Sequence, residues 1–229
     1  MSEIKLIIIG SKSDLIQPLL EKAKNNNIYI FKVDREEWDL ENNLPSSEIT
    51  EKIINFQPTQ ILYAAGVNKP LIVKNEDTHN VLESLNNHIS VNCTSFVSIV
   101  DILQKNLKNQ LIGVHVISSL YGIYGRHTRL PYVVSKHALE GVVKCLSLEY
   151  PMTQIIGYRP GFFKTKLSDR NLSLDIQEKL SKRIAQKRFG LPSELSDSIL
   201  LNICNPNKYF TGTFITIEGG MISGGIFEP

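Results

Sequence analysis

The sequence predicts an α/β fold, a doubly wound parallel sheet with helices on both of its faces. Two observations predict it. Short runs rich in β-branched residues alternate with longer segments of helical periodicity, an order of elements that is typical of α/β folds. Most of the short runs are apolar throughout, which indicates strands that are covered on both faces, as in a parallel sheet.

In chain order, each β-branched run predicts a strand, and each periodic segment between two runs predicts a helix. The expected strands are residues 5–9, 28–33, 60–65, 111–117, 154–158 and 213–217. The expected helices are residues 15–25, 47–56, a long one around 81–107, and then 131–149, 174–187 and 193–203. Since no repeat, low-complexity tract or Pro/Gly/Ser-rich linker divides the 229 residues, we expect a single domain over residues 1–229.

The composition, with 42% hydrophobic and 21% charged residues, is that of an ordinary folded protein. Lys and Arg number 25 against 23 Asp and Glu, and this near balance gives no reason to expect a nucleic-acid or membrane partner. The apolar run before Gly10 is too short for a signal peptide, and no stretch reaches the roughly 18 apolar residues of a membrane span.

Residue types that form disulfides or bind metals show no such pattern in this chain. The cysteines are odd in number and widely spaced: Cys93, Cys145 and Cys204. Four histidines fall on different expected elements, and no pair has ligand spacing: His88, His115, His127 and His137. We therefore predict no metal site, no disulfide framework, and a cytoplasmic protein.

A dinucleotide site in this fold needs a strand, a tight glycine turn and a helix N-terminus that faces the pyrophosphate. The segment LIIIGSKSDLIQPLL supplies the strand, one glycine and the helix. The residues that we expect to face the cofactor here are Gly10, Ser11, Lys12, Ser13 and Leu15. Asp14 can instead cap the N-terminus of the helix.

The second expected strand ends in Asp34 and Arg35, about 20 residues beyond the turn. A carboxylate at this position is the usual partner of the adenosine ribose hydroxyls, whereas an arginine beside it can hold a 2′-phosphate. Asp39 is a candidate neighbour of the adenine. The residues thus argue for NAD and for NADP, and the preference stays open.

Tyr132 and Lys136 are four residues apart, so they project from one face of the helix expected after Pro131. Hydride addition to a carbonyl leaves an alkoxide that must be protonated. A phenol with a pKa near 10 is a poor acid–base group at neutral pH unless a nearby cation lowers its pKa, and Lys136 can do that while it binds the cofactor ribose. Ser119 ends a strand 13 residues before Tyr132 and can bind the substrate oxygen.

Several further motifs stand in the same order as in a known family. Tyr63-Ala64-Ala65-Gly66 stands where that family has N-N-A-G, Asn92 lies 27 residues before Ser119, and residues 159–165 read RPGFFKT. Residues 188–194, 211–213 and 218–220 follow. On these motifs the whole chain resembles the short-chain dehydrogenase/reductase family, in its compact branch with a Rossmann-type fold and no added substrate domain.

The resemblance implies an NAD(P)-dependent oxidoreductase that interconverts a carbonyl and a hydroxyl group, with a small-molecule substrate. It implies a homotetramer or homodimer, and an Asn92 that extends a proton relay to the lysine through water. The catalytic residues that it implies are Asn92, Ser119, Tyr132 and Lys136. The further cofactor-binding residues are Ala65, Gly66, Pro160, Gly161, Phe163 and Thr165, together with Tyr132 and Lys136.

The glycine turn departs from the family pattern T-G-x-x-x-G-x-G, and from the T-G-x-x-G-x-x-G of the family's longer members. Ile9 replaces the threonine, Ile16 the last glycine, and Ser13 or Asp14 the middle one. An isoleucine at the point where helix and strand pack closely predicts a displaced helix, and an aspartate near the pyrophosphate repels it. These departures motivate an alternative, a cofactor-sensing or scaffolding protein without useful turnover. A nucleotide-sugar-modifying enzyme uses the same Tyr and Lys and is a third possibility.

Residues 164–190 form the segment that we expect to close over the substrate. Residues 164–188 carry eight basic and three acidic side chains, late in the fold, where loops beyond the strand ends form binding crevices. Two interpretations remain open: a solvated amphipathic helix, and a lid over an anionic substrate.

Overall fold

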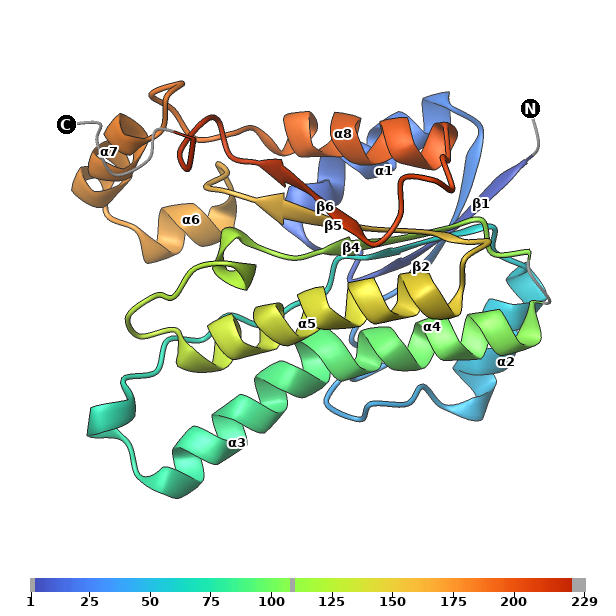
Figure 1. Cartoon of the computed structure of the whole chain (residues 1–229), viewed down its shortest axis with the longest axis horizontal. Helices are drawn as coiled ribbons and strands as arrows, with labels where there is room; N and C mark the ends of the chain where they lie inside the picture. Colours follow the sequence, from blue (N-terminus) through green and yellow to red (C-terminus); the bar gives the residue numbers. More distant parts are fainter. Residues whose placement is uncertain (1–2, 108–109, 224–229) are drawn as a thin grey trace.

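The computed structural model describes residues 3–107 and 110–223, and its centre is one six-stranded sheet in the order β2-β1-β3-β4-β5-β6. All five strand pairs are parallel. The strands are β1 (Ile4–Ile9), β2 (Ile28–Val33), β3 (Gln60–Tyr63), β4 (Gly113–Ile117), β5 (Gln154–Pro160) and β6 (Thr213–Ile217). The predicted doubly wound parallel sheet of Rossmann type is confirmed (Figure 1).

Helices cover both faces of this sheet (Figure 1). On one face lie α1 (Gln17–Asn25) and α8 (Pro192–Cys204). The other face carries α2 (Ser47–Phe56), α3 (Thr78–Ile89), α4 (Ser95–Asn106) and α5 (Leu130–Glu149). Two short helices, α6 (Lys166–Asn171) and α7 (Leu174–Arg183), lie beyond the end of β5. Single 3-10 turns occupy Asp14–Ile16, Val73–Asn75 and Leu120–Gly122.

Alternate residues of β1 point to opposite faces of the sheet, which is why an unbroken isoleucine run forms its centre. Ile7 and Ile9 are buried with α2, α4 and α5 in one apolar cluster. Leu6 and Ile8 are buried with α1 and α8 in the other. Each such side chain contributes about 1.5–3 kcal/mol when it leaves water. The two clusters hold the strand ends in place on both sides.

The structure corrects several of the predicted element boundaries. The expected helix 81–107 is two helices joined by a π-helical turn, Ser90–Thr94, and it begins earlier because the Asp77 side chain accepts a hydrogen bond from Asn80 N (2.9 Å). The expected helix 15–25 begins at Gln17 after a 3-10 turn. α6 was not predicted, and it exists because Thr165 and Ser173 each cap a separate helix; α7 ends at Arg183, before the predicted end at 187.

No helix in the two described ranges is long and apolar enough to cross a membrane. Within the same ranges, no group of three or more His, Cys, Asp or Glu side chains is placed to hold a metal ion. His115 is fully buried between Tyr158 and Gln60, at 3.1 Å from each, and burial lowers its pKa to about 3, so it is a neutral core residue.

Candidate active site

A cavity of about 860 Å³ runs along the carboxyl ends of the strands. Its wall includes the residue that directly follows each of five strands: Gly10, Asp34, Ala64, Ser118 and Gly161. Ligands of open α/β sheets bind at this edge, where the strand order reverses, and here the reversal lies between β1 and β3. The fold therefore brings the predicted nucleotide turn and the predicted acid–base residues to one cavity.

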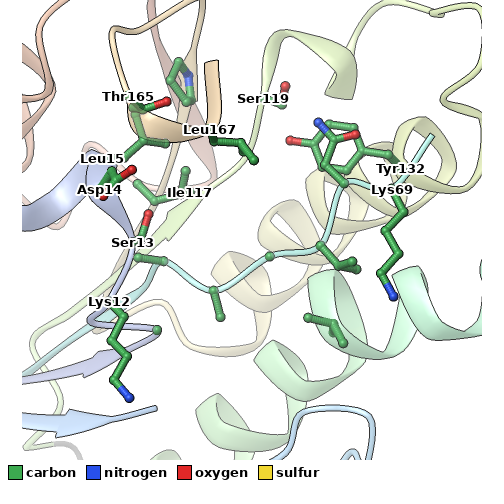
Figure 2. A pocket seen from close by; sticks show the side chains of 18 of the residues that line it. Lys12, Ser13, Asp14, Leu15, Lys69, Ile117, Ser119, Tyr132, Thr165 and Leu167 are labelled. Carbon is green, nitrogen blue, oxygen red and sulfur yellow. The ribbon is translucent and has the colours of Figure 1, made fainter. Parts of the chain in front are cut away.

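All but two of the residues predicted for catalysis and cofactor binding line this cavity. The two that do not are Ser11 and Asn92, which lie behind its wall. Figure 2 shows the two ends: Lys12 and Ser13 lie at one, and Tyr132 and Lys69 at the other. We call these the nucleotide end and the substrate end.

The turn keeps a single glycine, Gly10, and the backbone conformation there requires it. Its φ is +82°, in the region that residues with a Cβ rarely adopt, and an added Cβ would lie 2.6 Å from Ala65 N. The turn is tied to β2, since the Ser11 hydroxyl donates to Asp34 Oδ2 (2.6 Å) and Lys12 N donates to Asp34 Oδ1 (3.2 Å). The sharp turn thus survives the loss of the other glycines.

The charged residues of the nucleotide end are largely paired with one another. Lys12 forms an ion pair with Glu36. Arg35 contacts Asp39 (3.4 Å) and Glu41 (3.2 Å) on an exposed surface. Lys12 and Arg35, the two cations beside Asp34, therefore already have carboxylate partners.

Asp14 does not cap the helix that follows it, so that interpretation is wrong. Its Oδ2 accepts a hydrogen bond from Lys166 N (3.0 Å), the first residue of α6. Ile16, which replaces a family glycine, is fully buried in the cluster with α1 and α8. The altered turn is thus part of the core on one side and is linked to residues 164–190 on the other.

Tyr132 and Lys136 lie on the first two turns of α5, which begins at Leu130. Pro131 is its second residue, a position where proline favours the start of a helix. Lys136 is buried, its Nζ lies 5.8 Å from the centre of the Tyr132 ring, and it donates to Ile117 O (2.8 Å). Burial lowers the pKa of Lys136 to about 8.

Burial raises the pKa of the Tyr132 phenol, although the residue as a whole is only partly buried. A hydrogen bond from Ser119 and the charge of Arg129 act in the opposite direction. From the sequence, Lys136 was expected to be the group that lowers this pKa. In the structure the groups that do so are Ser119 and Arg129, and the net shift is upward.

Ser119 follows β4 and is mostly buried, and its Oγ also accepts from Tyr121 N (3.2 Å). Behind it, Ser118 donates to Glu140 (3.2 Å), and Arg159 donates to both oxygens of Glu140 (2.7 and 2.6 Å). Because Glu140 lies one helical turn after Lys136, this buried fork fixes α5 against β4 and β5. The serine and the tyrosine are therefore held in register.

Asn92 lies in the π-helical turn between α3 and α4, a distortion that is frequent at functional sites. Its amide nitrogen donates to Val67 O (2.9 Å) and Ser135 Oγ (2.8 Å), and its oxygen accepts from Val67 N (2.8 Å). A Cβ at Gly66 would lie 3.2 Å from Asn92 Oδ1 and 3.8 Å from Lys136 Nζ. Asn92 thus holds the segment after β3 beside Lys136, and the relay through water stays a prediction.

Three cations of the substrate end were not predicted from the sequence, and all of them line the cavity: Lys69, Arg126 and Arg129. Two arginines within seven residues before Tyr132 were the available signal. Tyr121, which lines the same end, packs edge-on against Tyr132 with 6.3 Å between the ring centres.

The basic segment 164–188 mostly faces away from the cavity. Of its eight basic residues only Lys166 and Arg170 line it. On α7, Lys179 pairs with Asp175 and Lys182 with Glu178, each at 2.7 Å and on exposed surface. For α7 the geometry favours a solvated amphipathic helix over a lid that binds an anion.

Residues 55–222 match the family model described as enoyl-(acyl carrier protein) reductase. The chain is 25% identical over 224 residues to a 3-oxoacyl-(acyl-carrier-protein) reductase of Rickettsia felis, with 95% of this chain and 86% of that protein covered. It is 28% identical over 183 residues to the enzyme of the same name from Thermotoga maritima, with 76% and 71% covered.

Solved structures share the fold. A 4-hydroxyisoleucine dehydrogenase complexed with NADH superposes with a TM-score of 0.86 at 18% identity, covering 97% of this chain and 100% of that chain. ElxO with NADP bound has a TM-score of 0.80 at 19% identity, with the same coverage.

Proposed function

The chain belongs to the short-chain dehydrogenase/reductase family, and we propose that Tyr132, Lys136 and Ser119 carry out the proton chemistry of its reaction. It is an oxidoreductase that interconverts a carbonyl and a hydroxyl group with NAD or NADP. The observation that supports these residue roles best is the placement of Ser119, Tyr132 and buried Lys136, whose Nζ lies 5.8 Å from the Tyr132 ring centre, in the same cavity as the Gly10 turn.

The cavity fits a dinucleotide. Gly10 leaves the turn without a side chain at the point where its backbone meets Ala65, and the cavity continues from there past all five strand ends to Tyr132. When bound, the nicotinamide supplies or accepts the hydride. Gly10, Ser13 and Leu15 would hold the pyrophosphate, Asp34 the adenosine ribose, and Lys136 the second ribose; Pro160, Gly161, Phe163 and Thr165 would hold the nicotinamide side.

In the reducing direction Ser119 and Tyr132 both bind the substrate oxygen. The raised pKa keeps the phenol of Tyr132 protonated at neutral pH, so it can give its proton to the alkoxide that forms. With a pKa of about 8, Lys136 is mostly a cation at pH 7 and stabilises the phenolate that remains. In the oxidising direction the same groups act in reverse.

Two relatives of this chain are named as 3-oxoacyl-(acyl-carrier-protein) reductases, which supports a ketone at the 3-position of an acyl group as the substrate class. Three expectations stay predictions: the homodimer or homotetramer, the cytoplasmic location, and the single domain with a lid at 164–190.

The test is a fluorescence titration with NADH and with NADPH, followed by turnover assays with a panel of 3-oxo compounds. We expect one nucleotide to bind, and Tyr132→Phe to lower kcat by about 10²–10⁴-fold with little change in nucleotide affinity. Ser119→Ala should lower kcat as well. If neither nucleotide binds at high concentration, the scaffolding alternative replaces this proposal.

A further inference from the structure

The substrate end of the cavity carries three cations that have no acidic partner. Lys69, Arg126 and Arg129 line it, and within residues 3–107 and 110–223 none of them forms an ion pair. Arg126 donates instead to the Tyr121 hydroxyl (2.6 Å). Arg129 Nη1 is buried, and no hydrogen-bond acceptor in the described part of the chain reaches it. A buried guanidinium nitrogen without an acceptor costs free energy that a ligand can recover.

These cations lie close enough to act on one another. Burial, and then the charge of Arg126, lower the pKa of Arg129. Lys69 and Arg129 also help burial to lower the pKa of His88, whose Nε2 accepts from Lys69 N (3.2 Å). Like charges that repel one another in a partly enclosed site are stabilised together by a bound anion.

The backbone holds Arg129 in this place at a cost. Thr128, directly before it, has a φ of +65°, an unfavourable conformation for a β-branched residue. Its carbonyl accepts from Leu71 N (2.9 Å), so the segment that carries Lys69 and the loop that carries both arginines lie side by side. Strained residues of this kind concentrate at ligand-binding sites.

The cluster adjoins the reacting centre, since Arg129 lies three residues before Tyr132 and its charge acts on that phenol. We propose that the substrate carries an oxyanion, a carboxylate or a phosphate, close to its reacting carbonyl, and that Arg129 with Arg126 and Lys69 binds it. The inference rests on the proposed function, because it names the substrate class of the same site. Guanidinium forks suit both kinds of oxyanion.

The binding test uses protein saturated with the nucleotide that it binds, so that the nucleotide end is filled, and titrates malonate and inorganic phosphate by calorimetry. We expect one of the two to bind, and Arg129→Gln to weaken it at least about 10-fold, which is about 1.4 kcal/mol. Arg183→Gln, an exposed arginine of α7 outside the cavity, is the matched control and should change nothing. A preference for malonate or for phosphate decides which oxyanion the site takes.

Loss of folding is separable from loss of the site. Because Arg129 repels Arg126, Arg129→Gln should keep or raise the melting temperature of the ligand-free protein. If neither anion binds the wild-type protein, or if Arg129→Gln and Arg183→Gln bind equally well, the inference is overturned.

The turnover test compares acetoacetate with methyl acetoacetate, which differ only in the charged group. We expect kcat/KM to favour the acid over the ester at least about 10-fold, Arg129→Gln to abolish this ratio, and Arg183→Gln to keep it. Equal turnover of acid and ester would overturn the inference and leave the proposed function intact. If neither compound is reduced, the proposed function is in question, and the anion titration still decides the inference.

Discussion

The two ends of the cavity use charge in different ways. Around Asp34 at the nucleotide end, the two nearby cations have carboxylate partners, Lys12 with Glu36 and Arg35 with Asp39 and Glu41, and Asp34 binds the turn itself. At the substrate end Lys69, Arg126 and Arg129 have no acidic partner in the described part of the chain. A site that is already neutralised offers little attraction to a further charge, whereas a site of unpaired cations favours an anion. The difference suggests a neutral ribose at one end and a charged substrate at the other.

Lys136 lies where the two ends meet, and Lys136→Met should have the largest effect. Turnover should fall by about 10²-fold or more, because the phenolate loses its cation. Stability should rise at pH 7. In the folded protein the pKa of Lys136 is about 8, below its ordinary value of 10.5, so between these two pH values the unfolded chain binds the proton more readily. The free energy of unfolding is therefore highest above pH 10.5 and decreases as the pH falls to about 8.

At pH 7 the wild-type protein has lost all of the stability that depends on a neutral Lys136. A methionine has no charge to bury, so the variant does not have this loss. The gain should approach roughly 3 kcal/mol, from 2.5 pH units at 1.36 kcal/mol each. Urea denaturation at pH 7 and at pH 10 measures it, and the advantage of the variant should shrink at the higher pH. A variant that is less stable at both pH values would contradict this account.

Gly10→Ala tests the nucleotide end alone. The added Cβ would lie 2.6 Å from Ala65 N at a φ of +82°, so we expect a loss of stability of about 1–3 kcal/mol and at least 10-fold weaker NADH binding. Gly125→Ala is the matched control, since its Cβ would meet nothing within 4 Å. Equal behaviour of the two variants would show that the Gly10 turn does not form the nucleotide site.

The paired charges of the nucleotide end predict a preference for NADH over NADPH of about 10-fold, because a 2′-phosphate would meet Asp34 and would find both nearby cations engaged. Asp34→Ser should narrow the ratio of the two dissociation constants. If the wild-type protein binds NADPH more tightly than NADH, the paired charges do not make the nucleotide end unfavourable for a further phosphate, and the contrast between the two ends is wrong.

The smallest effect is expected from Asp14→Asn. The amide oxygen can still accept from Lys166 N, while the negative charge beside the pyrophosphate site is removed. NADH should bind about 5-fold more tightly, which corresponds to about 1 kcal/mol. Asp175→Asn, an exposed change on α7, controls for the general loss of one negative charge. Unchanged affinity would mean that the carboxylate lies too far from the pyrophosphate to repel it.

The sequence by itself determined the α/β sheet, the order of most of its elements and the position of Gly10, Ser119, Tyr132 and Lys136. These depend on local properties: the residues of a strand are consecutive, the pair on α5 is one helical turn apart, and a strand end puts the next residue at the sheet edge. The predicted helix boundaries were wrong where a capping side chain sets the start of the helix, as Asp77 does for α3 and Thr165 for α6.

Only the tertiary structure decided which charges remain unpaired. The sequence drew attention to the basic residues of 164–188, yet α7 pairs its lysines with its own acids. The cations that line the substrate end come from two loops about 60 residues apart. Asp14 likewise bonds to a helix 152 residues away. Whether a charge is neutralised depends on neighbours that folding brings together, and the chain order of one segment does not contain that information.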